Sequence, residues 1–136
     1  MNNLTIKAEE ENVEEVIGFV RGELERFDCR EESMMQVELA IEEIFVNIAT
    51  YAYEQGEGEA EIRVDVSDLP PYVTITFLDH GTPFNPLDFA DADTSREALE
   101  EREGGLGILM VKKTMDEVTY SFENGENILT VRKNMG

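Results

Sequence analysis

The sequence predicts an α+β fold, a two-layer sandwich in which helices pack on one face of a mainly antiparallel sheet. Strand-type alternation and helical spacing follow one another in the order β-α-α-β-β-loop-α-β-β. Asn124-Gly125 separates the last two strands and predicts a tight hairpin, because both residues tolerate the positive φ of a type I′ turn. The 136 residues suffice for a single core, and we find no repeat or linker. We therefore expect one domain over residues 1–136.

The N-terminal half carries a short strand and two helices. Residues 4–8 alternate briefly and predict the first strand. Apolar residues recur at helical spacing over residues 13–27, after a run of glutamates that suits the positive end of a helix dipole. A longer helical pattern covers residues 32–53, and two glycines shortly after it break the chain.

The C-terminal half carries four strands and one helix. Residues 62–66 alternate between apolar and charged side chains, which is typical of a half-buried strand. Residues 72–79 predict the next strand, which follows a Pro-Pro turn. Residues 107–115 have helical spacing, and residues 116–122 and 127–133 predict the paired strands of the hairpin.

The charge of the chain excludes two classes of partner. Eleven basic and 31 acidic residues give a net charge of −20. Nucleic acids and anionic membranes require a basic surface, so we expect neither, whereas basic protein partners remain compatible. No segment has the pattern of a signal peptide or the ~20 apolar residues of a membrane span. The single cysteine, Cys29, allows no internal disulfide and suits a reducing compartment, so we expect a cytoplasmic protein.

The second helix contains a Glu-x-x-x-Asn motif, Glu43 and Asn47, on a narrow polar stripe. Leu39, Val46 and Ala49 extend its apolar surface, so we expect this helix to be buried over most of its circumference. Residues four apart are neighbours on a helix, so Glu43 and Asn47 can share one water or ion. The asparagine oxygen suits Mg²⁺, and the carboxylate could accept a proton from a water or hydroxyl. An ordinary solvated Glu-Asn pair is the alternative interpretation.

A second motif, Asp79-x-Gly81-x-Pro83, closes an apolar strand. An ionised carboxylate accepts hydrogen bonds, so Asp79 could bind the exocyclic amine of adenine. Gly81 would let the backbone approach the base closely, and Pro83 would stiffen the turn. A simple strand-ending turn is the alternative, because Asp and Gly are common in turns. His80, the only histidine, is interpreted as an exposed loop residue.

A third motif is the glycine-rich start of the last helix, formed by Gly104, Gly105, Leu106 and Gly107. Glycines at a helix start expose backbone N–H groups to phosphates, and the helix dipole adds attraction. The motif lacks the Gly-Lys-Ser/Thr of a P-loop and does not follow a strand as a Rossmann motif does. A linker or an unusual helix cap is the alternative. The preceding residues 80–104 lack a core pattern, and such a long loop is usually functional or disordered.

The order of the three motifs resembles the ATPase superfamily of gyrase, the heat-shock chaperone, histidine kinases and mismatch-repair proteins, which share the Bergerat-type ATP-binding fold. The resemblance implies ATP and Mg²⁺ as cofactors. It implies Glu43 as the catalytic base and Asn47 as the magnesium ligand. Asp79 would read adenine, and the glycine motif would hold the phosphates. It also implies a mobile lid over about residues 84–103, whose cations are Arg96 and Arg102, and suggests Thr130 on the last strand as a further adenine contact.

The short chain is similar to the serine kinases that act as anti-sigma factors. The resemblance implies a kinase that phosphorylates an antagonist protein and so acts as a switch on a sigma factor. It also implies a homodimer that pairs near the N-terminal strand. That family often has His-Gly four and five residues after the motif asparagine, whereas this chain has Tyr51-Ala52. The departure keeps an alternative open, a non-catalytic module that binds ATP and a protein partner. A free ATPase is a third interpretation, which we expect less because the 136 residues offer no room for the transducer domain usual for one.

Overall fold

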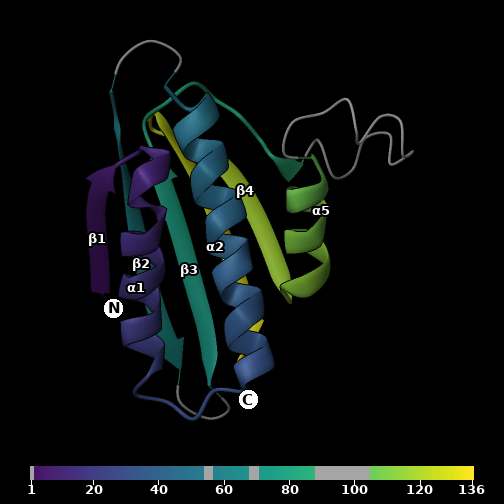
Figure 1. The fold of residues 1–136 in the computed structure, drawn as a ribbon. Helices are drawn as coiled ribbons and strands as arrows, with labels where there is room; N and C mark the ends of the chain where they lie inside the picture. Colours follow the sequence, from purple (N-terminus) through teal and green to yellow (C-terminus); the bar gives the residue numbers. More distant parts are fainter. Residues whose placement is uncertain (1, 54–56, 68–70, 88–104) are drawn as a thin grey trace.

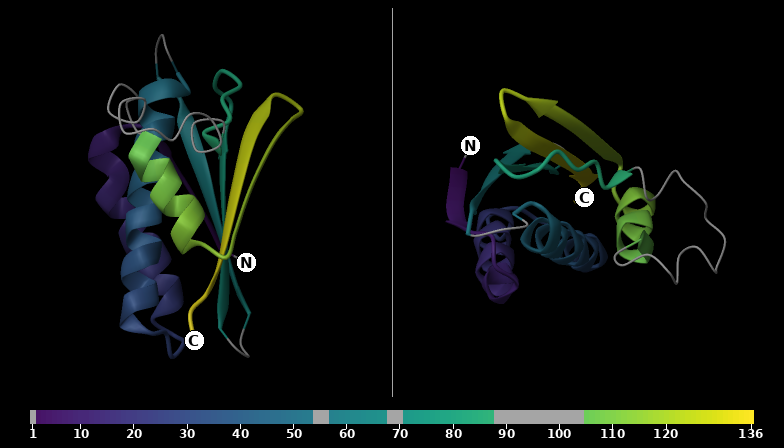
Figure 2. Two further views of the ribbon diagram at one scale, coloured as in Figure 1. Left: turned by 90° about the vertical axis from the view of Figure 1, so that its right-hand side faces the viewer. Right: turned by 90° about the horizontal axis from the view of Figure 1, so that it is seen from above.

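The computed structural model describes residues 2–53, 57–67, 71–87 and 105–136. Five strands form one antiparallel sheet in the order β1-β2-β3-β5-β4. The helices pack on one face of this sheet and give two layers (Figures 1 and 2). The elements are β1 (Asn2–Lys7), a 3-10 turn (Glu10–Asn12), α1 (Val13–Leu24), α2 (Glu31–Tyr51), β2 (Glu59–Ser67), β3 (Tyr72–Asp79), α5 (Gly105–Thr114), β4 (Glu117–Glu123) and β5 (Glu126–Asn134).

This architecture confirms the predicted α+β sandwich and the predicted order of its elements. The hairpin between β4 and β5 has the predicted backbone, with a φ of 53° at Asn124 and 80° at Gly125. The last helix begins at Gly105, two residues before the expected start, so the glycine motif lies partly within the first turn of α5. None of the helices in the described part of the chain is long and apolar enough to cross a membrane.

The core lies between the sheet and the helices. Successive strand side chains point to opposite faces, so every second residue of β2, β3 and β5 faces the helices. The buried residues on these strands include Ile62, Val64, Ile75, Phe77, Leu129 and Val131. They meet the buried faces of the helices, and together they form one apolar cluster.

The long helix α2 lies between α1 and α5 in the helical layer (Figure 2). Its inner face buries residues such as Val37, Ile41 and Phe45 against the sheet. The expectation that α2 is buried around most of its circumference is wrong, because Leu39 is 49% exposed. Among the described residues, helices form a single layer, so the outward side of α2 is not covered by a second layer. This leaves an apolar side chain on the surface.

Candidate functional site

The Glu-x-x-x-Asn motif lies in the C-terminal half of α2, where Glu43 faces the first turn of α5 and Asn47 lines a cavity at the sheet. Asn47 is only 9% exposed, and its Nδ2 donates a hydrogen bond of 2.8 Å to the backbone carbonyl of Glu43. This bond uses one hydrogen of the amide nitrogen and does not involve the carbonyl oxygen. Asn47 therefore presents an acceptor to the space that it lines together with Asp79.

The carboxylate of Glu43 lies against the first turn of α5. A Cβ atom on Gly107 would stand 3.0 Å from Glu43 Cγ, and closer than that to both Cδ and Oε2. Burial, and secondarily the charge of Glu42, raise the pKa of Glu43 above its ordinary value. No ion pair of Glu43 occurs among the described residues. The structure thus brings the candidate base directly to the glycine motif, which the sequence separates from it by some sixty positions.

The Asp79 turn is held by hydrogen bonds to two other elements. Asp79 is 5% exposed, and its Oδ1 accepts a 2.9 Å bond from the Gly81 N–H. Thr82 N donates 2.8 Å to the carbonyl of Ala52, at the end of α2. A Cβ on Gly81 would lie 2.5 Å from the carbonyl carbon of Ala52 and 2.6 Å from its Cβ. The missing side chain of Gly81 is therefore required by the end of α2, a packing reason that the sequence did not suggest.

Asn127 is a buried polar residue of the site that sequence reasoning missed. It is 5% exposed, and its Nδ2 donates to Asp79 Oδ1 at 2.9 Å and to the Thr82 carbonyl at 3.0 Å. Its Oδ1 accepts from Phe84 N at 3.1 Å and from the hydroxyl of Tyr120. The signal was present, because residues 127, 129 and 131 alternate on β5 and all face the helices. A polar residue in such an apolar row indicates a specific buried partner.

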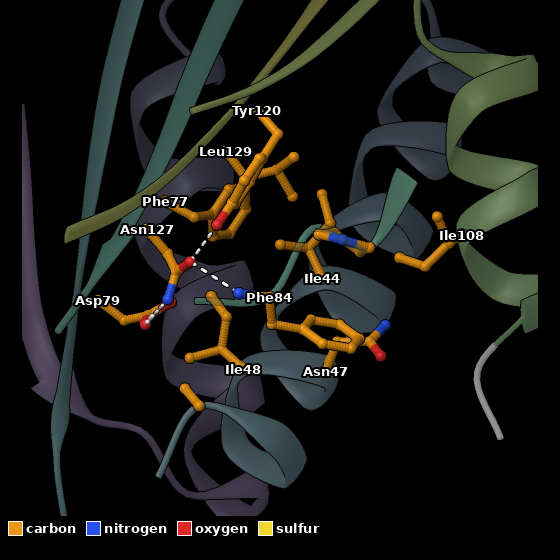
Figure 3. Close-up of a pocket in the computed structure, with 12 residues that line it drawn as sticks. Ile44, Asn47, Ile48, Phe77, Asp79, Phe84, Ile108, Tyr120, Asn127 and Leu129 are labelled. Carbon is orange, nitrogen blue, oxygen red and sulfur yellow. Dashed lines mark hydrogen bonds between the residues drawn. The ribbon is translucent and has the colours of Figure 1, made fainter. Parts of the chain in front are cut away.

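A narrow cavity of about 30 Å³ lies between Asn47, Asp79 and Asn127 (Figure 3). Apolar side chains make up the rest of its wall: Ile44, Ile48, Ala52, Phe77, Phe84, Pro86, Ile108, Tyr120 and Leu129. The ring of Phe84 stacks on Tyr51, with ring centroids 5.2 Å apart and an angle of 20° between the planes. The Asp79 carboxylate and the Asn47 amide among apolar side chains suit the polar edge of a flat heterocycle, and a volume of about 30 Å³ must widen to admit one.

The other predicted residues are placed as follows. Gly105 and Leu106 are the first residues of α5, and Gly104 lies outside the described residues. Pro83 is exposed and does not line the cavity beside Asp79. It lies between Thr82 and Phe84, whose N–H groups anchor the turn, so its own lack of an N–H costs no hydrogen bond. His80 is exposed, as expected.

The structure corrects the prediction that Thr130 contacts adenine. On β5 the residues that face the helices are 127, 129 and 131, so Thr130 points to the opposite face of the sheet. There it is paired with Thr76 on β3 and Thr119 on β4, and lines an open polar groove. The expectation that Thr130 contacts the same base as Asp79 is therefore not supported. Most of the expected lid, residues 88–103 with both of its arginines, lies outside the described residues.

The acidic residues of the described chain do not form a metal cage, since no group of three or more His, Cys, Asp or Glu side chains converges there. Mg²⁺ bound beside phosphates needs only one or two protein ligands. Asn47 Oδ1 is a hard oxygen donor one helical turn from the Glu43 carboxylate, so Asn47 could hold such an ion.

The chain belongs to the family described as the histidine kinase-like ATPase domain, which it matches over residues 6–133. This confirms the predicted superfamily and supports binding of ATP. Two solved structures share the fold. The catalytic domain of histidine kinase ThkA has a TM-score of 0.54 and 11% identity, and the match covers 99% of this chain and 98% of that one. Acinetobacter baumannii histidine kinase AdeS has a TM-score of 0.51 and 12% identity, and the match covers 100% of this chain and 70% of that one.

The chain is also similar to curated proteins named serine-protein kinase RsbW. The protein of Listeria monocytogenes serovar 1/2a is 24% identical over 105 residues, which are 74% of this chain and 66% of the relative. That of Staphylococcus aureus strain JH9 is 26% identical over 113 residues, 79% of this chain and 70% of the relative. The match thus spans just under two thirds of the Listeria protein. These names agree with the predicted resemblance to serine kinases.

Proposed function

We propose that this member of the histidine kinase-like ATPase family binds Mg-ATP and transfers its γ-phosphate to a hydroxyl of an antagonist protein, as an anti-sigma switch. The observation that carries the proposal is the contact between the Glu43 carboxylate and Gly107 at the start of α5. A carboxylate held beside a phosphate-binding helix start is where a base for phosphoryl transfer is needed.

The order of the candidate residues along α2 supports one orientation of the nucleotide. Glu43 adjoins the start of α5, Asn47 lies one turn further, and Ala52 contacts the Asp79 turn. The phosphates would therefore lie by α5, where Gly105 and Gly107 supply backbone N–H groups and Gly104 and Leu106 complete the motif. The base would lie by Asp79, with Gly81 and Pro83 shaping its turn. Phe84 and Pro86 cover the small cavity there, so base binding would require this cover to move.

In the proposed reaction Glu43 accepts the proton of the attacking hydroxyl. The hydroxyl oxygen forms a bond to the γ-phosphorus as the bond to the bridging oxygen breaks, and ADP leaves. Asn47 would hold Mg²⁺, which when bound neutralises charge on the phosphates. The raised pKa of Glu43 makes its carboxylate a stronger proton acceptor than an exposed one.

A protein substrate is supported by an exposed apolar strip beside Glu43. Met35, Leu39 and Met110 are 58%, 49% and 52% exposed. Leu39 and Met110 line the same narrow cleft between α2 and α5 as Glu43. Exposed apolar side chains that lie together are typical of interaction sites. The neighbouring groove is lined by Glu14, Glu42 and the Arg21–Glu38 ion pair. Its net charge is negative, so a partner with basic residues around an apolar centre fits best.

A homodimer through β1 is part of the proposal. Among the described strands, β1 pairs only with β2 and forms an edge of the sheet, so its outer backbone groups can pair with a second chain. Thr5→Pro should weaken this pairing, because proline removes a donor. Sedimentation equilibrium at several protein concentrations measures it, and an unchanged dimer in the variant contradicts a β1 interface.

Binding and transfer are tested separately. Calorimetry with Mg-ATP tests the nucleotide site, and Asp79→Asn should lower the affinity; absent binding by the native protein, or undiminished affinity in the variant, refutes that part. Proteins retained from the native lysate with and without ATP are the candidate antagonists. Radiolabelled Mg-ATP then tests phosphate transfer to each. ATP-dependent retention without any transfer would favour the second candidate, a non-catalytic ATP-binding module, which Tyr51-Ala52 keeps open.

A further inference from the structure

We propose that Asn127 is the positioning residue that makes the site selective for a 6-amino purine. This inference rests on the proposed function, because it concerns how Asp79 reads the base. Asn127 would not contact the reacting atoms. It would act by holding the Asp79 carboxylate and the turn that follows in one conformation. The base would then always meet the same oxygen of Asp79.

The side chain of Asn127 has no spare capacity for a ligand. A primary amide has two donor hydrogens and an oxygen that accepts two bonds. The hydrogens are used by Asp79 Oδ1 and the Thr82 carbonyl, and the oxygen by Phe84 N and the Tyr120 hydroxyl. Because the nitrogen meets acceptors and the oxygen meets donors, only one orientation of the amide satisfies all four partners. Asn127 therefore works as a fixed link, by which we mean a side chain whose four hydrogen bonds hold Asp79, Thr82, Phe84 and Tyr120 in place.

The link joins three segments that border the cavity. Asp79 ends β3, Thr82 and Phe84 belong to the turn after it, and Tyr120 comes from β4 (Figure 3). Asp79 Oδ1 already accepts two bonds, from Asn127 Nδ2 and from Gly81 N. The second carboxylate oxygen is then the one that remains for an exocyclic amine. A 6-oxo purine presents an oxygen there instead, and two acceptors repel.

The test compares Mg-ATP with Mg-ITP, because the two bases differ at the 6-position, where an oxygen replaces the amine. A hydrogen bond to a charged group is strong enough that native protein should bind Mg-ATP at least about tenfold tighter. In Asn127→Ala the Asp79 carboxylate and the turn lose their common anchor, so this ratio should fall toward one. A purely structural loss would lower both affinities together and leave the ratio unchanged.

Two further variants keep the inference testable if Asn127→Ala does not fold. Tyr120→Phe removes only the hydroxyl that bonds Asn127 Oδ1, and should reduce the ratio by about two- to tenfold. Asn134→Ala is the matched control, since Asn134 lies seven residues along the same strand, about 23 Å away, and should keep the native ratio.

The outcomes separate the two proposals. If the native protein binds neither nucleotide, the proposed nucleotide function is wrong, and this inference with it. If native protein prefers Mg-ATP and both Asn127→Ala and Tyr120→Phe keep that preference, the nucleotide function stands and the role of Asn127 is refuted. Circular dichroism and thermal melting of each variant establish that the protein compared is folded.

Discussion

Gly107→Ala is a sharp test of the proposed base because it shifts the Glu43 carboxylate without removing any polar group. The added methyl would lie within 3.0 Å of the Glu43 carboxylate. To regain a van der Waals separation, the carboxylate must move by roughly 1–2 Å. The obstructing atoms are the far end of a flexible side chain, so the fold can adapt while the position of the base cannot.

The substitution should affect stability and phosphate transfer in opposite directions. Replacing glycine by alanine in a helix stabilises it by up to about 1 kcal/mol, so the melting temperature should stay the same or rise by a few degrees. Displacing a catalytic group by about 1 Å can lower the rate about 100-fold. We therefore expect phosphate transfer to fall by about two orders of magnitude in a protein that is at least as stable as the native one.

The assay is γ-phosphate transfer from radiolabelled Mg-ATP, together with calorimetric binding of Mg-ADP and a thermal melt. Gly18→Ala is the matched control, because it is the same substitution in mid-α1 and its new methyl meets no atom within 4 Å. The control should gain similar stability and keep full transfer. Unchanged transfer by Gly107→Ala would refute the assignment of Glu43. If Mg-ADP binding fell as much as transfer, the methyl would instead be disturbing the binding of the phosphates rather than the position of Glu43.

Four further predictions follow from individual contacts. Glu43→Gln should lower transfer by ~10²–10⁴ and change Mg-ATP affinity at most a few-fold, because the amide keeps the shape but cannot take the proton; full transfer would contradict a catalytic base. Asn47→Ala should weaken nucleotide binding in Mg²⁺ but not in EDTA, as calorimetry in both buffers shows. Gly81→Ala should destabilise the fold by about 1–3 kcal/mol in urea unfolding, since its methyl meets the backbone of Ala52, and no loss would contradict that contact. The pKa of Glu61 is lowered, chiefly by a hydrogen bond from an arginine on the same strand, so its stabilisation is present above its ordinary pKa of 4.5 and is lost as pH falls below it. Glu61→Gln should therefore flatten the fall of urea stability between pH 5 and about pH 3.

The fold could be predicted from the sequence because its periodicities are local. β3 carries a regular apolar row and matches the predicted bounds, residues 72–79. The turn at Asn124 and Gly125 follows from the φ that these two residues tolerate. Leu39 was misjudged because a helical pattern gives the width of an apolar face but not whether a second layer covers it. Burial of that face depends on which elements lie opposite, and this is a property of the assembled fold.

The sequence predicted the residues of the site only where a short motif contains polar side chains that are unusual in an apolar segment. Glu43, Asn47 and Asp79 are polar residues beside apolar ones. The structure places Asn47 and Asp79 on one cavity and Glu43 on a cleft between α2 and α5. Asn127 was missed because an asparagine near an Asn-Gly turn is ordinary in sequence, and three of its four partners lie more than forty residues away in the chain. Thr130 was misplaced for a simpler reason: a shift of one residue along a strand moves a side chain to the other face.

The Tyr51-Ala52 departure bears on the base end of the site rather than on the transfer chemistry. Ala52 accepts the Thr82 N–H and contacts Gly81, so a small residue is needed there, and alanine satisfies that need. Tyr51 stacks on Phe84, which covers the cavity beside Asp79. Eight residues, about 12 Å of helix, separate Tyr51 from Glu43. The departure can therefore change how the base enters the cavity while the carboxylate stays against α5. The geometry by Glu43 thus gives no reason to prefer the non-catalytic module.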